Sequence, residues 1–276
     1  METISIVNQK GGVGKTTTSV HLALALSRRG KKILAVDMDP QANLSITFGL
    51  VPVPEAPISI YEVLDPESPT MIGSAHRETR FPNIRLVYGH IAMSALDQVR
   101  SYEPARMLLK KIDAATRSDF DFMIIDCPPA LSLPTVNALA SSDSYIVPIK
   151  SGDFYALYGM NLLNQTILGI KKQVNPRLRL RGVLLTMYDG RLNVCRVVEE
   201  EVKNLFEPLE GGMFKTRIHQ NTVAEKAVLM KKVIHEVDRN AVSALDYNAL
   251  AKELLGEQGN GEAETADAVA TQEAGR

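Results

Sequence analysis

The sequence is poor in cysteine and in long apolar runs, and these absences restrict the class of protein. It has two cysteines, Cys127 and Cys195, so one chain cannot build a disulfide framework or a four-thiolate metal site. No apolar run approaches the roughly 18 residues of a membrane span, and no basic stretch precedes an apolar one at the amino terminus, as a signal peptide would require. We therefore expect a cytoplasmic protein in a reducing compartment, with no membrane partner.

The sequence also has little net charge, but its charges are unevenly distributed. The formal charge is −1 over 276 residues, of which 45% are hydrophobic, a fraction typical of globular proteins. Residues 1–170 carry 15 basic and 16 acidic side chains, residues 171–232 carry 13 and 7, and residues 233–276 carry 3 and 9. The local basic excess is the electrostatic footprint of a phosphate-backbone binder, although a solvated face balanced by an acidic tail would give the same counts.

Short apolar runs alternate with helical patterns along most of the chain. Strands are expected at Ile4–Asn8, Lys32–Val36, Ile84–Tyr88, Phe122–Ile125, Tyr145–Pro148 and Gly182–Thr186, with a weak strand at Met213–Ile218. Helices are expected at Thr16–Arg29, Pro104–Thr116, Leu133–Ala140, Tyr158–Lys172, Cys195–Leu205, Thr222–Leu229 and Ala241–Leu255. This alternation predicts an α/β fold: a doubly wound, mostly parallel sheet with helices on both faces.

The pattern predicts one domain over residues 1–255. The proline-rich stretch Val51–Ile60 is interpreted as an irregular insertion within it. Residues 256–276 are acidic, lack apolar periodicity and are rich in Gly, Ala, Glu and Thr, so we expect a disordered tail.

A glycine-rich loop between the first strand and the first helix is the strongest functional signal. Residues 9–17 read QKGGVGKTT. Glycines let backbone N–H groups approach phosphate oxygens, and the helix N-terminus adds partial positive charge. The strict phosphate-loop pattern G-x-x-x-x-G-K-[ST] fails at Gln9, and Lys10 is an additional cation. The residues expected to hold the nucleotide phosphates are Gly11, Gly12, Val13, Gly14, Lys15, Thr16 and Thr17, with the Thr16 hydroxyl on Mg²⁺.

Residues 10–17, KGGVGKTT, resemble the deviant Walker A sequence of the ParA/MinD superfamily of P-loop ATPases. The resemblance continues at residues 36–43 (VDMDPQAN), 122–129 (FMIIDCPP), 153–159 (DFYALYG) and 184–191 (LLTMYDGR). Together these segments span roughly residues 1–255 and are similar to chromosome- and plasmid-partition ParA proteins. The resemblance implies a P-loop NTPase fold with ATP and Mg²⁺.

Three aspartates follow strands that should end beside the phosphate loop. Ligands of doubly wound sheets bind at the carboxyl ends of the strands, so Asp126 is expected to hold Mg²⁺; the alternative is an ordinary strand-end aspartate. By resemblance, Asp39 orients the attacking water and Asp37 supports the magnesium site. Phosphoryl transfer needs such positioning more than a strong base.

The resemblance also implies roles for residues around the nucleotide. Lys10 would cross a dimer interface to the partner's phosphates, which implies an ATP-dependent two-fold homodimer. Met187 and Asn221 would lie near the base, while His219 stands where the family has proline.

A family arginine that binds DNA without sequence preference is matched by Arg191. The segment at 221–234 departs from the family: it lacks an arginine at Val223, a proline at Val228 and a glycine at Lys231. We expect this segment to be more helical than in the family. The residues expected to contact nonspecific double-stranded DNA are Arg191, Lys226, Lys231 and Lys232.

The sequence therefore predicts a slow, partner-stimulated ATPase that dimerises on ATP and binds nucleoid DNA. A ParB-like protein would be the partner, and a chromosome or plasmid the cargo. One alternative is a ParA-like positioner of a protein cargo, such as a chemoreceptor cluster or a microcompartment. A second alternative is a MinD-like membrane-cycling ATPase, which is disfavoured because the acidic tail is not a basic amphipathic helix. The remaining alternatives are a metabolic P-loop enzyme or cluster carrier, and a nucleotide-gated DNA-binding regulator with negligible hydrolysis.

Overall fold

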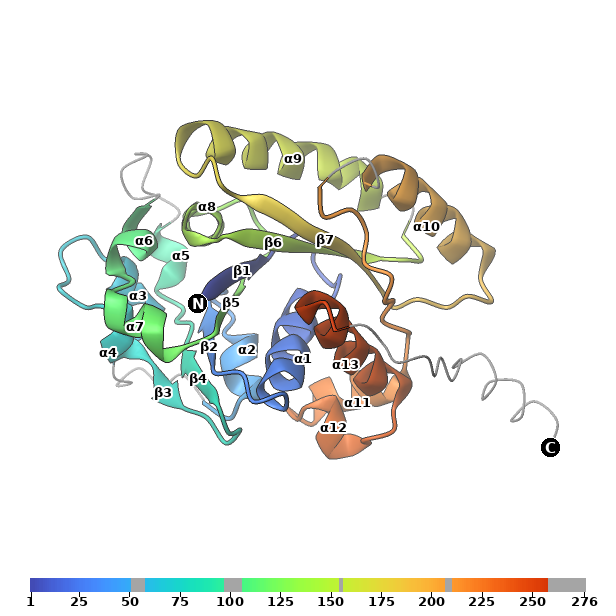
Figure 1. The fold of residues 1–276 in the computed structure, drawn as a ribbon, viewed down its shortest axis with the longest axis horizontal. Coiled ribbons are helices and arrows are strands. Elements are labelled where there is room, and N and C mark those ends of the chain that lie inside the picture. The colour runs from blue at the N-terminus through green and yellow to red at the C-terminus, as the bar shows by residue number, and fades with distance from the viewer. Residues whose placement is uncertain (51–57, 97–105, 154–155, 207–209, 258–276) are drawn as a thin grey trace.

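The structure is a computed structural model that describes residues 1–50, 58–96, 106–153, 156–206 and 210–257 (Figure 1). Its centre is a seven-stranded sheet of order β3-β4-β2-β5-β1-β6-β7. The strands are β1 (Glu2–Ile6), β2 (Ile33–Asp37), β3 (Arg77–Glu78), β4 (Ile84–Val87), β5 (Phe122–Asp126), β6 (Ser144–Lys150) and β7 (Arg179–Thr186). All neighbouring strands are parallel except β3, which pairs antiparallel with β4 at one edge.

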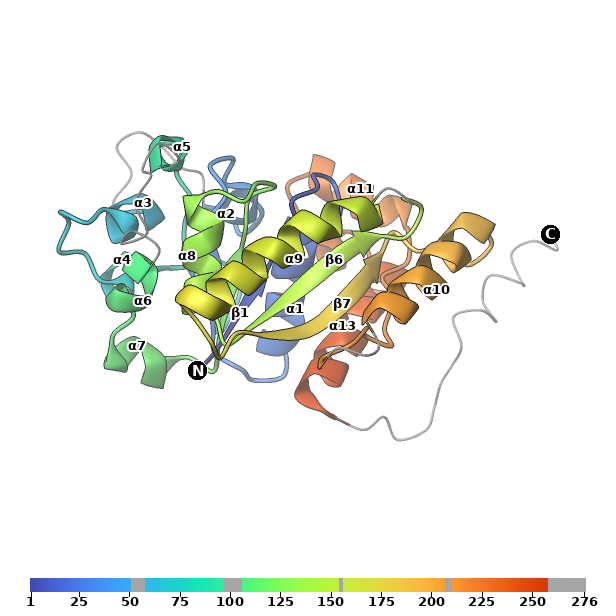
Figure 2. The same cartoon turned by 90° about the horizontal axis from the view of Figure 1, so that it is seen from above.

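Helices cover both faces of this sheet. They are α1 (Lys15–Ser27), α2 (Asn43–Thr47), α3 (Ile60–Leu64), α4 (Ile72–Ala75), α5 (Met93–Leu96), α6 (Met107–Lys111), α7 (Ala114–Asp119), α8 (Leu133–Ser141), α9 (Ala156–Gln173), α10 (Asn193–Phe206), α11 (Thr222–Leu229), α12 (Ile234–Val237) and α13 (Val242–Leu255). Figures 1 and 2 show α8, α9 and α10 on one side of the sheet, and α1, α11 and α13 on the other.

Two apolar cores follow from the alternation of side chains along each buried strand. On β2, Leu34 and Val36 belong to the core beneath α3 to α6 and α8 to α10, whereas Ile33 and Ala35 belong to the core beneath α1, α2 and α11 to α13. Both faces are buried, which explains why the strands are apolar throughout. The predicted doubly wound α/β fold is confirmed.

The structure differs from the prediction in one helix and in one edge strand. The sequence pattern predicts one helix over Pro104–Thr116, but from residue 106 onward the chain forms α6 and then α7. The break lies at Asp113, whose carboxylate accepts the Thr116 N–H at 2.7 Å and caps α7. The antiparallel edge strand β3 was not predicted.

The weak strand expected at Met213–Ile218 is also absent from the described residues. Only single bridges join Met213 to Val183 and His219 to Tyr188. The Glu253 carboxylate accepts the N–H groups of Lys215 and Thr216 at 2.6 and 2.9 Å, and these donors are therefore not available to continue a ladder.

The carboxyl-terminal helix α13 packs along α1 and ends at Gly256, a left-handed residue with φ 68°. The predicted disordered tail lies outside the described residues from 258 onward, and the predicted insertion does so at 51–57. Among the helices that the structure describes, none has both the length and the apolar character needed to span a bilayer.

Candidate nucleotide site

The loop between β1 and α1 has the backbone of a phosphate cradle. Gly12 and Gly14 adopt positive φ angles of 71° and 85°, which glycine tolerates without strain. The Val13 carbonyl accepts the Thr186 hydroxyl at 2.9 Å, and the same threonine lies 3.6 Å from where a Cβ on Gly14 would be. The end of β7 thus fixes the loop that opens α1.

Lys15 is folded back across this loop. The residue is 7% exposed, and its Nζ donates to the Lys10 carbonyl at 2.8 Å. Burial lowers the pKa of Lys15, while the nearby Asp126 opposes that shift. An ammonium group is therefore held inside the loop, where the β- and γ-phosphates of a nucleotide would need it.

Asp126 ends β5 beside the first turn of α1. Its two carboxylate oxygens accept the hydroxyls of Thr16 at 2.7 Å and Ser19 at 2.9 Å. Burial, together with Asp37, raises the pKa of Asp126 to about 8. A hydroxyl and a carboxylate at this spacing are oxygen ligands of the type that Mg²⁺ prefers, so Thr16 and Asp126 would hold the ion. When bound, it would neutralise charge on the nucleotide phosphates.

The other two aspartates have different surroundings, although Asp37 ends β2 and Asp39 follows two residues later. The Asp37 carboxylate is buried and accepts from the Ser45 N–H at 2.9 Å, the Ser45 hydroxyl at 2.6 Å and the Asp39 N–H at 3.2 Å. Burial raises the pKa of Asp37 to about 6. Asp39 lines the cavity described next, and its Oδ1 accepts the Gln41 N–H at 2.9 Å. Asp39 is thus placed where it could orient water, and Asp37 shapes the turn that presents it.

A cavity of about 540 Å³ opens beside the phosphate loop. Its lining includes Gly11, Gly12, Gly14, Lys15, Thr16, Thr17, Val20, His21, Asp39, Met187, Ala224, Ala227, Val228, Lys231 and Lys232. A smaller cavity of about 120 Å³ adjoins it and is lined by Met187 and Asn221, and by several of the same residues. Asn221 also caps α11, since its Oδ1 accepts the Val223 N–H at 2.7 Å. Except for Val13, the predicted phosphate and base residues therefore line two cavities that share several lining residues.

The residues predicted to contact DNA do not share one environment. The Arg191 side chain is 87% exposed and forms two hydrogen bonds with the Asp189 carboxylate, both at 2.9 Å. Lys226, Lys231 and Lys232 are all exposed, but only Lys231 and Lys232 also line the nucleotide cavity. Lys10 forms an ion pair with Asp153 and is not among the described residues that line the cavity.

Three supporting hydroxyls were missed from the sequence: Ser19, Ser45 and Thr186. Ser19 lies three residues after Thr16 on α1, so helical spacing could have placed both hydroxyls on the Asp126 side. Ser45 and Thr186 reach the site only through the packing of α2 and β7, and no local pattern marks them.

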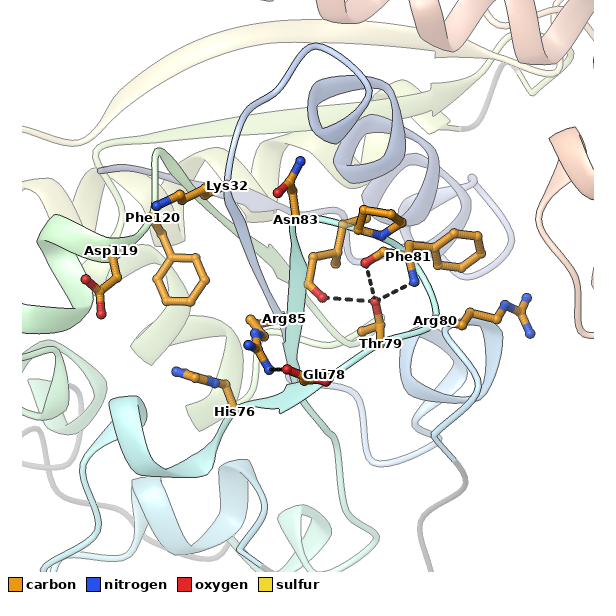
Figure 3. A pocket seen from close by; sticks show the side chains of 12 residues that line it. Lys32, His76, Glu78, Thr79, Arg80, Phe81, Asn83, Arg85, Asp119 and Phe120 are labelled. Atoms are coloured by element: carbon orange, nitrogen blue, oxygen red, sulfur yellow. Dashed lines mark hydrogen bonds and ion pairs between the residues drawn. The ribbon is translucent and has the colours of Figure 1, made fainter.

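A second hollow, of about 560 Å³, lies at the amino ends of β2, β4 and β5, whereas the phosphate loop follows the carboxyl end of β1 (Figure 3). It is lined by charged side chains of both signs, among them Lys32, Glu78 and Arg85, the last two joined at 2.7 Å. It contains none of the predicted nucleotide residues, so the candidate nucleotide site is the cavity at the phosphate loop.

Comparisons with known proteins agree with this geometry. The family described as an AAA domain matches residues 1–180. The chain is 36% identical to the sporulation initiation inhibitor protein Soj of Bacillus subtilis, covering 91% of this chain and 97% of that protein. It is 34% identical to the chromosome partitioning protein ParA of Myxococcus xanthus, with coverage of 91% and 87%. The chain belongs to the ParA/Soj family of partition ATPases.

Solved structures share the architecture of this ParA-family ATPase. Cobyrinic acid a,c-diamide synthase of Mycobacterium smegmatis, crystallised with ADP and magnesium, superposes with a TM-score of 0.77 at 29% identity. The superposition covers 95% of this chain and 97% of that chain. The predicted family, ATPase activity, and use of ATP and Mg²⁺ are thereby confirmed.

Proposed function

We propose that this ParA-family ATPase dimerises on ATP, binds nucleoid DNA without sequence preference and segregates a chromosome or plasmid. A ParB-like partner would stimulate hydrolysis and so release the protein from DNA. The relative from Myxococcus xanthus is named a chromosome partitioning protein, which supports a role in partition. The placement of Lys10 is the observation that best supports the proposed dimer.

Lys10 belongs to the phosphate loop, yet it is not among the described residues that line the cavity of its own chain. The ammonium group pairs with Asp153, and the side chain remains 41% exposed. Lys15 already occupies the loop and donates to the Lys10 carbonyl. In a two-fold dimer joined at the loops, each Lys10 would face the partner's nucleotide and stabilise charge on its phosphates, as an arginine finger does.

Sedimentation velocity with ATP or ADP tests the dimer. Wild type should form dimers with ATP but not with ADP. Lys10→Ala should remain monomeric with either nucleotide, because the cation at the interface is removed. Asp153→Asn is the matched control: it removes the same ion pair but keeps the lysine, so ATP-dependent dimers should persist. If Lys10→Ala dimerises as wild type does, Lys10 has no role between subunits.

The proposed DNA contact is made by Arg191, in the loop that follows β7. Its pair with Asp189 lies at the surface, where an ion pair contributes little free energy and can be exchanged for a DNA phosphate. The loop leaves the sheet at the carboxyl end of β7, the same end at which Thr186 contacts the phosphate loop. Nucleotide binding and DNA binding would therefore both occur at the carboxyl ends of the strands.

Binding to random-sequence duplex DNA over a salt series tests this contact. Arg191→Ala should weaken ATP-dependent binding for every sequence and reduce the salt slope by about one for each subunit of the dimer, because each subunit neutralises one fewer phosphate. Arg177→Ala is the matched control, because Arg177 is exposed just before β7 begins, at the opposite edge of the sheet. An unchanged salt slope in Arg191→Ala would show that Arg191 contacts no phosphate.

A further inference from the structure

The carboxyl end of α11 has an unusual backbone. The Lys231 N–H donates to the Val228 carbonyl at 3.1 Å, and the Lys232 N–H donates to the Ala227 carbonyl at 2.9 Å. These two bonds form a Schellman motif, in which the residue at the position of Lys231 is left-handed and is usually glycine. Here it is a lysine with φ 52°, a conformation that side chains with a Cβ adopt at a cost.

Capping alone does not explain this lysine. A cation near the end of a helix interacts favourably with the helix dipole, but Lys232 supplies that charge without a positive φ. Within the described part of the chain, the Lys231 side chain forms no ion pair that would hold it. A strained residue kept at a cavity wall points to a function of its side chain.

The cavity wall indicates which ligand this side chain meets. Lys231 lines the same cavity as Lys15, Thr16 and Thr17, and Asp39 is the one acidic residue in the described lining. The space therefore favours an anion. Ala224 and Val228 of α11 line both this cavity and the smaller one beside Asn221, so a nucleotide that extends between the two spaces must pass along α11.

We propose that Lys231 binds the phosphate chain of the nucleotide, so that ATP is held between the phosphate loop and the end of α11. The flexible four-carbon stem gives the ammonium group the reach to follow the phosphates as they settle in the loop. Lys231 would then be a nucleotide-binding residue rather than the DNA contact expected from the sequence. DNA binding is left to Arg191 and to exposed lysines outside the cavity.

Isothermal titration with ATP, ADP and adenosine in the presence of Mg²⁺ tests the assignment. Lys231→Gly and Lys231→Asn remove the ammonium group and introduce residues that tolerate a left-handed backbone. Both should weaken ATP and ADP binding about tenfold, the loss expected for one charge-assisted hydrogen bond, and leave adenosine binding unchanged. Lys231→Arg should retain most of the affinity. Lys231→Gly should also melt at a higher temperature than wild type without nucleotide, which would show that it folds and that strain was relieved.

The control is Lys252→Asn, which removes an exposed lysine from the last turn of α13, away from the described lining of either cavity. Its ATP affinity should equal that of wild type. Unchanged ATP affinity in Lys231→Gly would overturn the proposal, as would an equal loss for ATP and adenosine, since the second result indicates a structural effect. Weaker binding to duplex DNA with unchanged ATP affinity would return Lys231 to the DNA surface.

Discussion

His21 joins the helix after the phosphate loop to the first residue of α12, and we predict that this link breaks in acid. Its Nδ1 lies 2.8 Å from the Thr17 carbonyl, and its Nε2 accepts the Ile234 N–H at 3.0 Å. The ring also stacks on Tyr247 with centroids 5.0 Å apart. Because a backbone N–H can only donate, Nε2 must be unprotonated, and protonation of His21 would remove this bond.

The size of the effect follows from the pKa of His21, which burial lowers from 6.5 to about 4. Between these two values the unfolded chain binds a proton that the folded chain does not. The free energy of unfolding therefore falls as the pH drops through this window. At about 1.4 kcal/mol per pKa unit, His21 accounts for a loss of about 3 kcal/mol between pH 6.5 and pH 4.

Urea denaturation of wild type and His21→Gln from pH 7.5 to pH 4 measures this loss. The variant should be less stable at pH 7.5, because it loses the stack on Tyr247, but should lose about 3 kcal/mol less than wild type on acidification. Tyr247→Phe is the control: it alters the same stack without removing a group that titrates in this window, so it should follow the wild-type pH dependence. Parallel curves for wild type and His21→Gln, or an NMR titration of His21 near pH 6.5, would refute the reasoning.

Three further predictions concern the nucleotide site. Lys15→Ala should abolish ATP binding measured by calorimetry, and tight residual binding would contradict the assignment of the phosphate loop. Asp39→Ala should bind ATP yet release phosphate about a hundredfold more slowly, because it lacks the carboxylate that positions water; near-normal turnover would place that role elsewhere. Ser45→Ala should lower the free energy of unfolding by about 2 kcal/mol, because buried Asp37 loses a hydroxyl donor; an unchanged urea midpoint would show that this bond contributes nothing.

The parts of the site that could be predicted are those encoded by neighbouring residues. The glycines and Lys15 lie within one loop, and Asp37 and Asp126 each end an apolar strand, so strand order alone brings the two aspartates together. Thr186 could not be predicted, because it reaches the Val13 carbonyl across 173 residues of chain. Only the completed sheet places the end of β7 against the phosphate loop.

The lysines at the end of α11 show a second limit of prediction from the sequence. The helix Thr222–Leu229 was predicted with its observed bounds, because its propensities are local. The position of Lys231 at the cavity depends instead on how α11 packs in the fold, where it contacts α12, and counting charges along the sequence cannot predict that packing. The predicted strand at Met213–Ile218 was wrong for the same reason: the competing acceptor, Glu253, lies in a helix some 37 residues further along the chain.

The position of β1 in the sheet has a consequence for the order in which the protein opens. β1 pairs on one side with β5 and on the other with β6, so its amides have partners along both edges. Amides of this kind exchange with solvent deuterium only when the whole sheet separates, whereas edge strands such as β3 exchange through local fraying. We therefore expect the strand that carries the phosphate loop to exchange slowly, so that nucleotide could enter and leave many times before this strand opens.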